Sequence, residues 1–188
     1  MLDAATDLFV EQGWSATTVD QIAARAGTSR PTVFALGSKA RLLKLARDVA
    51  MAGDDEDLAV SQRQSAQRVL AEPDPERCLE RLAMHVTGVV ERYAPLDEVL
   101  RHAAHNDPEL TELWRTSEAQ RRTGARLFID NLALKGRLNG SRSTMVDVLW
   151  LLMAPDQYCR LVRDRGWSRR RYVTWLAAAM AALLLAPS

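Results

Sequence analysis

Apolar residues recur along most of the chain at the three- and four-residue spacing of an amphipathic helix, and no segment sustains the two-residue alternation of a strand. The clearest stripe comprises Val19, Ile22, Ala23 and Ala26, and Gly27 follows it as a helix stop. The same spacing predicts further helices, which cover about residues 2–12, 58–71, 76–94, 109–135, 142–165 and 168–185. The pattern therefore predicts an all-α fold.

Proline and glycine mark the expected ends and bends of these helices. Gly13 ends the first helix, and Pro95 breaks or kinks the long helix that begins near residue 76. Pro155 kinks the helix over residues 142–165 for the same reason. The acidic run 54–57 marks a shift in composition, which indicates a bend that leads into longer helices.

The first 50 residues hold the most informative arrangement of helices. Residues 26–29 form a turn before a short helix that has Pro31 in its first turn, and a further helix starts at Lys39. A small turn residue between a packed helix and a short second helix is typical of a helix-turn-helix, whose second helix enters the major groove of DNA. We therefore expect a helix-turn-helix domain over residues 1–47 and a second helical domain over residues 48–188.

The charge distribution agrees with a DNA-binding segment. The whole chain carries 25 basic and 24 acidic residues, and this near-neutral balance excludes a uniformly basic, histone-like protein. Residues 20–50, however, have a net charge of +4, between a flank of −3 over residues 1–19 and one of −5 over residues 51–76. Positive charge is thus concentrated where DNA phosphates would be met.

Composition, cysteine spacing and the length of the apolar stretches indicate where in the cell the protein is expected. Apolar residues make up 47% of the chain and charged residues 26%, a balance typical of a folded protein rather than a disordered one. Cys78 and Cys159 lie far apart in the sequence, which indicates a reducing cytoplasm and no disulfide framework. The most apolar stretch, residues 176–186, is about half as long as the ~20 residues of a membrane helix. We therefore expect a cytoplasmic protein without a membrane segment.

Short motifs over residues 2–45 narrow the interpretation further. They are Leu2-Asp3-Ala4-Ala5, Leu8-Phe9, Gly13-Trp14, Thr17-Thr18-Val19, Ile22-Ala23, Ala26-Gly27-Thr28-Ser29, Thr32-Val33-Phe34 and Ser38-Lys39. In this order they resemble the signature of TetR-type (TetR/AcrR-like) transcriptional regulators. The resemblance implies an all-helical homodimer with a DNA-binding N-terminal domain and an effector-binding, dimerising C-terminal domain. It further implies a repressor that a small molecule releases from a palindromic, double-stranded DNA operator.

The resemblance also carries the family's DNA contacts onto this chain. They fall on Thr18, Ser29, Arg30, Pro31, Thr32, Phe34 and Lys39. Arg30 would pair with guanine, and Thr32 would touch a thymine methyl group or a phosphate. Thr18 and Lys39 would hold phosphates, although Thr18 could be a simple helix cap and Lys39 a solvated side chain.

Three departures from the family pattern support an alternative function. Phe34 stands where the family usually has a tyrosine whose hydroxyl meets a phosphate, and residues 34–39 form a stretch one residue shorter than usual. The chain also begins inside what is normally the first helix. The alternative is a small-molecule-binding helical protein whose DNA-reading head is degenerate.

The resemblance implies an effector site among the middle helices. The candidate residues are Met84, His85, Tyr93, Trp114, Phe128 and Trp150. Each lies on a helical stripe, so packing in the core is the alternative to ligand binding. His85 is polar amid apolar neighbours and needs either a partner on another helix or a ligand.

Catalytic and metal-binding signatures are weak in this sequence. Glu98, His102 and His105 share one helix face and could ligate a metal, but a solvated face is the alternative. We find no serine–histidine–carboxylate set and no glycine-rich phosphate loop. The sequence therefore favours a non-enzymatic protein, with no metal site and no cofactor assigned.

The C-terminal helices carry more apolar surface than a single chain needs. Val173, Leu176, Met180 and Leu183 form one stripe of the last helix, with alanines around it. Such a terminal helix suggests a homodimer through about residues 142–185, in a four-helix arrangement, with docking inside one chain as the alternative. Residues 160–188 have a net charge of +5, which we assign to the rim of this interface rather than to DNA.

Overall fold

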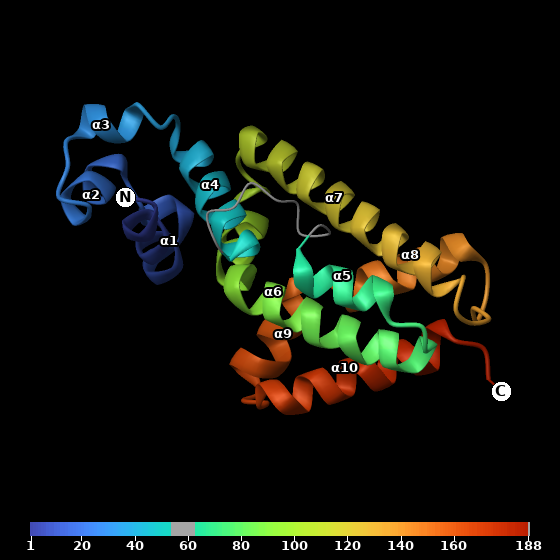
Figure 1. Cartoon of the computed structure of the whole chain (residues 1–188). Helices are drawn as coiled ribbons and strands as arrows, with labels where there is room; N and C mark the ends of the chain where they lie inside the picture. Colours follow the sequence, from blue (N-terminus) through green and yellow to red (C-terminus); the bar gives the residue numbers. More distant parts are fainter. Residues whose placement is uncertain (54–62, 188) are drawn as a thin grey trace. The chain divides into compact units, whose positions relative to one another are not determined.

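The computed structural model of the chain describes residues 1–53 and 63–187. Within these ranges the chain is built from helices, and the one β-feature is an isolated bridge between Leu138 and Leu185. The predicted all-α fold is therefore confirmed (Figure 1). The acidic run 54–57 lies outside the described residues. No helix of the described part is both long enough and apolar enough to cross a membrane.

The chain divides into two compact units. The first comprises residues 1–55 and 92–117, and the second comprises residues 56–91 and 118–188. The two longest helices, α6 (Pro75–Ala103) and α7 (Pro108–Leu132), contribute residues to both units.

The first unit begins with four helices: α1 (Leu2–Ala16), α2 (Val19–Arg25), α3 (Arg30–Phe34) and α4 (Lys39–Ala52). The C-terminal part of α6 and the first part of α7 complete it. Apolar side chains from all six helices form one buried cluster, since each stripe turns inward. Its fully buried members include Phe9, Ile22, Val33, Leu42, Leu43, Leu100 and Leu110.

Hydroxyl caps fix where the short helices of this unit begin. Thr18, Ser29 and Ser38 precede α2, α3 and α4, and each side chain accepts a hydrogen bond from the backbone N–H of the third residue onward. These bonds satisfy groups that a helix start leaves open, which matters most for helices too short to be stable alone.

The second unit contains α5 (Gln64–Ala71), the first part of α6, the rest of α7, α8 (Arg142–Leu152), α9 (Pro155–Tyr158), the π-helical turn η2 (Cys159–Asp164) and α10 (Arg169–Leu184). Helix α10 packs against α8. Fully buried side chains of this unit include Leu79, Ile129, Leu132, Leu149, Tyr172, Leu176 and Met180.

The two prolines that were expected to break or kink helices have different effects. Pro155 does interrupt the segment 142–165, which the structure divides into α8, α9 and η2. Pro95, which was expected to break or kink its helix, does not break it, because α6 continues through it to Ala103. Proline removes one backbone hydrogen bond. Here Leu96 and Leu100 are buried just beyond it, so tertiary packing holds the helix together.

Candidate nucleic-acid interface and effector site

Helix α3 is anchored by a single side chain and presents the others to solvent. Val33 is buried, whereas Arg30, Pro31, Thr32 and Phe34 are exposed. A short helix with one buried anchor and four exposed neighbouring side chains suits the reading of a groove.

The start of α3 is fixed by a serine–threonine pair. Thr32 donates its backbone N–H to Ser29 Oγ at 3.3 Å, and the two hydroxyl oxygens lie 2.7 Å apart. Pro31 occupies the first turn, where its missing N–H costs nothing. Ser29 is therefore engaged in the cap, while its exposed position keeps it at the same surface as Arg30.

Arg30 lies along the exposed surface of α3. Its guanidinium carbon is 5.4 Å from the centre of the Phe34 ring, and Nη1 is 3.4 Å from Asp20 Oδ2. The side chains of Arg30 and Asp20 are 59% and 66% exposed, so this ion pair is weak and exchangeable. The Phe34 ring thus packs against the Arg30 guanidinium, although, unlike a tyrosine, it has no hydroxyl group.

Thr18 adopts the cap arrangement that the sequence left open. Gln21 donates its backbone N–H to Thr18 Oγ1 at 3.2 Å, and the Thr18 N–H donates to Gln21 Oε1 at 2.8 Å. This reciprocal pair is a capping box. A phosphate at this helix start would compete with the Gln21 carbonyl for the Thr18 N–H.

Lys39 makes contacts that sequence reasoning missed. Its ammonium donates to the backbone carbonyls of Trp14 and Thr17 at 2.9 and 3.0 Å, and lies 3.9 Å from the centre of the Trp14 ring. Burial lowers the pKa of Lys39, while the nearby carboxylate of Asp107 raises it in part. Lys39 therefore fastens the start of α4 to the end of α1.

The short stretch between α3 and α4 closes without an extra residue. Gly37 donates its backbone N–H to the Phe34 carbonyl at 2.9 Å and has a φ of +120°. A Cβ at this position would lie 2.2 Å from Cδ of Arg41, so a side chain would meet both backbone strain and a clash. The glycine explains how the chain turns here while both flanking helices keep their caps.

Two arginines join α4 to α6 inside the first unit. Arg47 donates from Nε and Nη2 to Asp97 Oδ1 at 2.9 and 2.7 Å, and its guanidinium carbon is 4.9 Å from the Tyr93 ring centre. Arg92 donates to the carbonyls of Ala50 and Met51 at the end of α4. Because Arg47 is only 4% exposed, it does not belong to the DNA-facing charge counted from the sequence.

The predicted effector residues do not form one cluster. Tyr93 and Trp114 belong to the first unit, and the other four belong to the second. Tyr93 is part of the Arg47–Asp97 cluster, and Trp114 packs at the edge of the core. Met84 is 50% exposed and lines an open surface hollow beside Arg77 and Arg81.

His85 and Phe128 meet inside the second unit. The His85 Nδ1 lies 3.0 Å from the Ser65 hydroxyl of α5, and its ring centre is 6.0 Å from that of Phe128. The imidazole therefore has a partner on a neighbouring helix, which is the alternative that the sequence left open. The pair bridges α5, α6 and α7.

Trp150 has a polar environment that stands out in the second unit. The guanidinium carbon of Arg121 lies 4.8 Å from its ring centre, and Arg121 bonds both the Trp150 carbonyl and the Glu118 carboxylate. The indole Nε1 is buried and has no hydrogen-bond partner among the described residues. A buried donor without an acceptor is costly, so this group requires an explanation.

The corner before α10 is held by a network around Glu91. Tyr158 donates its hydroxyl to Glu91 Oε1 at 3.1 Å, and Arg169 donates from Nε to Oε2 at 3.0 Å. Burial and the bond to Glu91 raise the pKa of Tyr158 to about 12. Arg171 covers the Trp167 ring at 4.0 Å. These contacts give several arginines of this basic segment intramolecular roles.

The two histidines of the possible metal-binding face each lie within hydrogen-bond distance of Arg101. His105 Nδ1 lies 2.9 Å from the Arg101 carbonyl, and His102 Nε2 lies 3.2 Å from the Arg101 guanidinium. Among the residues that the structure describes, no three histidine, cysteine or acidic side chains are grouped as a metal would need.

Comparisons with known proteins agree with this architecture. The family described as bacterial regulatory proteins, tetR family, matches residues 1–45. No curated protein sequence matches the chain significantly.

Solved structures share the fold along nearly the whole chain. A protein from Saccharomonospora viridis, described as a transcriptional regulator in complex with choline, has 16% identity and a TM-score of 0.72, with 99% of this chain and 96% of that chain covered. A TetR transcription regulator from Haloarcula marismortui has 15% identity and a TM-score of 0.68, with 97% and 95% covered. A Rhodococcus protein described as a transcriptional regulator has 21% identity and a TM-score of 0.64, with 99% and 93% covered. The N-terminal 45 residues therefore match the tetR family of bacterial regulatory proteins, and the whole chain shares the fold of solved structures described as TetR or transcriptional regulators.

Proposed function

We propose that the protein is a cytoplasmic transcriptional repressor that binds a palindromic operator as a homodimer and leaves it when a small molecule binds. The observation that carries this proposal is the exposed surface of α3, where Arg30, Pro31 and Thr32 surround a single buried anchor. Two such helices would enter successive major grooves about 34 Å apart.

Each predicted contact residue has a place in this proposal. Arg30 exchanges its weak pairing with Asp20 for a guanine, and Thr32 meets a neighbouring base or phosphate. Pro31 and Phe34 supply apolar contact, and Ser29 and Thr18 approach phosphates through their exposed hydroxyls. Lys39 acts indirectly, since its ammonium holds α4 against the end of α1.

The test is a DNA-binding titration at several salt concentrations. DNA from upstream of the protein's own gene and a selected random library serve as targets. Arg30→Ala is expected to weaken specific binding by about 1–3 kcal/mol, as for loss of a bidentate base contact. Arg115→Ala removes another exposed arginine of the same unit and is the matched control. The proposal fails if no target gives a salt-sensitive complex.

The dimer interface is proposed along α8 and α10. Leu151 and Leu183 expose 55% and 47% of their surface on these helices. Exposed apolar side chains on a packed helix pair suit a two-fold four-helix contact. Sedimentation of Leu183→Glu should give a monomer, whereas Leu134→Glu, an 84% exposed leucine outside these helices, should remain dimeric.

The effector site is proposed in the second unit, around Trp150. The buried indole N–H would donate to an oxygen or nitrogen of the ligand, which accounts for its missing partner. The Saccharomonospora regulator holds choline, so a small organic molecule is a reasonable ligand class for this fold. Native mass spectrometry of the purified protein, and of Trp150→Phe, would detect a retained molecule and its dependence on the indole.

A second candidate function is a ligand-binding protein with a degenerate DNA-reading head. Phe34 favours it, because the exposed ring offers no hydroxyl to a phosphate. Ligand binding together with a DNA affinity that Arg30→Ala leaves unchanged would support this candidate over the repressor.

A further inference from the structure

We propose that Arg41, at the start of α4, binds a phosphate of the DNA backbone in place of Lys39. The family resemblance places a phosphate contact on Lys39 and none on Arg41. This inference rests on the repressor function proposed above, since it concerns how the same surface binds DNA. It names the residue that supplies much of the charge-dependent part of that binding.

Most of the positive charge of residues 20–50 is used inside the fold. This segment holds six cations. Four of them form ion pairs: Arg25 with Glu11, Arg30 with Asp20, Lys44 with Asp48 and Arg47 with Asp97. Lys39 donates to backbone carbonyls. Among the residues that the structure describes, Arg41 is therefore the one cation of the segment whose side chain has no acidic or hydrogen-bonding partner.

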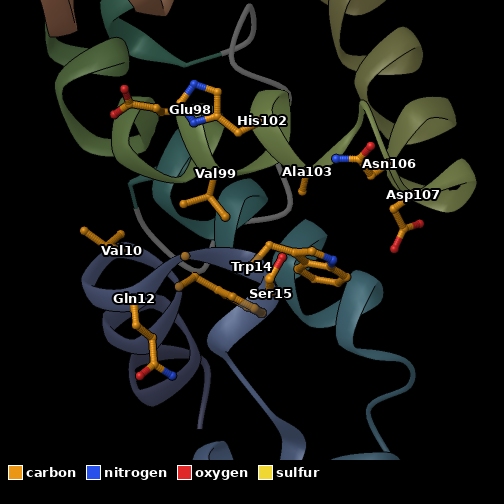
Figure 2. Close-up of a pocket in the computed structure, with 12 residues that line it drawn as sticks. Val10, Gln12, Trp14, Ser15, Glu98, Val99, His102, Ala103, Asn106 and Asp107 are labelled. Carbon is orange, nitrogen blue, oxygen red and sulfur yellow. The ribbon is translucent and has the colours of Figure 1, made fainter.

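Lys39 is directed toward the protein rather than toward a phosphate. Its ammonium donates to the carbonyls of Trp14 and Thr17 at 2.9 and 3.0 Å, and lies 3.9 Å from the Trp14 ring centre. Figure 2 shows this ring at the end of α1, beside the start of α4. The carboxylate of Asp107 also acts on the ammonium. A phosphate would have to displace these contacts, so Lys39 has a structural role.

The side chain of Arg41 crosses the turn that joins α3 to α4. Gly37 in this turn has a φ of +120°, and Cγ and Cδ of Arg41 fill the space where a Cβ of residue 37 would lie. Ser38 Oγ accepts the backbone N–H of Arg41 at 3.1 Å, which fixes the backbone of the arginine. Arg41 is nevertheless exposed. The fold thus positions the stem of the side chain directly after α3 and leaves the residue open to solvent.

No acidic residue of the described part pairs with the Arg41 guanidinium. Glu109 approaches the start of α4, but it accepts the hydroxyl of Ser38 at 3.1 Å. Residues 34–43 contain no aspartate or glutamate. A guanidinium can bind a phosphate through two parallel hydrogen bonds, and phosphate contacts set the position of a reading helix on the duplex. Arg41 therefore supplies the contact that the inward-facing lysine does not.

The experiment measures how DNA binding by the full chain depends on salt. The probes are two fluorescein-labelled duplexes, the tightest one selected from the random library and one of arbitrary sequence, followed by fluorescence anisotropy. Each phosphate contact contributes about 0.9 to the slope of log K against log salt concentration. Arg41→Gln removes one contact per chain and two per homodimer, so the slope should fall by about 2, and the affinity at about 0.1 M salt by about tenfold or more. Because phosphates carry no sequence information, both duplexes should lose affinity by the same factor.

Three further variants control this measurement. Arg41→Lys keeps the positive charge and should keep the wild-type slope, with a lower affinity because lysine lacks the paired donors. Arg115→Gln removes an exposed arginine of the same unit that is paired with Glu112, and should leave slope and affinity unchanged. Lys39→Met should keep the slope, since the slope counts phosphate contacts. Far-ultraviolet circular dichroism confirms that each variant is folded.

The outcomes separate this inference from the repressor proposal. An unchanged slope in Arg41→Gln, a loss confined to the selected duplex, or a slope that falls in Lys39→Met instead would overturn the role of Arg41. Each of these results, with a wild-type protein that still binds DNA, leaves the repressor function standing. A wild-type protein that forms no salt-sensitive complex with either duplex would contradict both proposals.

Discussion

Each unit contains an arginine stacked on an aromatic ring, but the two clusters differ in whether their buried polar groups have hydrogen-bond partners. In the first, Arg47 stacks on Tyr93 and binds Asp97, fifty positions away on α6, and both charged residues are only 4% exposed. In the second, Arg121 stacks on Trp150 and binds Glu118, three positions away on its own helix. The first cluster joins two helices by an ion pair, whereas the second leaves a buried indole N–H without an acceptor.

This difference indicates that the Arg47 cluster has a structural role, whereas the Arg121 cluster can rearrange. A long-range buried ion pair is costly to break, because the surviving charge stays in a low-dielectric core. A pair within one helix survives movement of that helix as a unit, and an unpaired donor gains energy when an acceptor arrives. We infer that the Arg47 cluster maintains the first unit and that the Trp150 cluster is free to respond to a ligand.

The largest expected effect is the loss of the acid in the first cluster. Asp97→Ala leaves Arg47 buried without its partner and should lower the free energy of unfolding by about 3–5 kcal/mol. Urea denaturation followed by circular dichroism measures it. Asp48→Ala removes a half-exposed carboxylate paired with Lys44 on the same helix, and should cost about 0.5 kcal/mol or less. A loss in Asp97→Ala no larger than in this control would refute the structural role.

A smaller effect is expected in the second cluster. Glu118→Ala should cost about 1–2 kcal/mol, because its side chain is 22% exposed and the pair lies within α7. The matched control is Glu112→Ala, which removes an exposed i,i+3 partner of Arg115 from the same helix. If Glu118→Ala were as damaging as Asp97→Ala, the proposed contrast between the clusters would disappear.

Replacing the indole should have the smallest effect of the cluster variants. Trp150→Phe keeps an aromatic surface under Arg121 and removes the unsatisfied N–H, so stability should change by about 1 kcal/mol or less. Thermal denaturation of the ligand-free protein measures this change. A loss of more than about 2 kcal/mol would indicate that the N–H is satisfied in the folded protein.

The fold could be predicted from the sequence because its signals are local. The stripe from Val19 to Ala26, the hydroxyl caps and the break at Pro155 each depend on residues a few positions apart. The sequence did not decide between a break and a kink at Pro95, because the packing of Leu96 and Leu100, which keeps α6 continuous there, is not contained in a local pattern.

Of the site residues, the sequence could predict only those whose exposure to solvent follows from their spacing along a helix. The exposed positions of α3 lie around one apolar anchor, and the motif order locates that helix. The partners of Arg47 and Lys39 are 50 and 22 to 25 positions away, so only the folded chain shows that these cations point inward. An apolar stripe likewise indicates burial but not which cavity a side chain lines, and the effector candidates therefore fell in two units.

Lys39 over the Trp14 ring is a third cation–aromatic pair, and its contribution to the free energy of unfolding should depend on pH. Burial lowers the pKa of Lys39 in the folded state below its ordinary value of 10.5, although Asp107 opposes this in part. The unfolded chain then binds more protons than the folded one between the two pKa values, so stability from this group rises with pH across that window.

Lys39→Met should lack this rise. The difference in unfolding free energy between wild type and Lys39→Met, measured by urea denaturation from pH 7 to 10.5, should therefore shift in favour of the wild type as pH increases. The comparison cancels the opposite trend from Tyr158, whose raised pKa reduces stability above pH 10 in both proteins. A difference that is constant with pH, or that falls, would show that the carbonyls of Trp14 and Thr17 compensate fully for the burial of the ammonium.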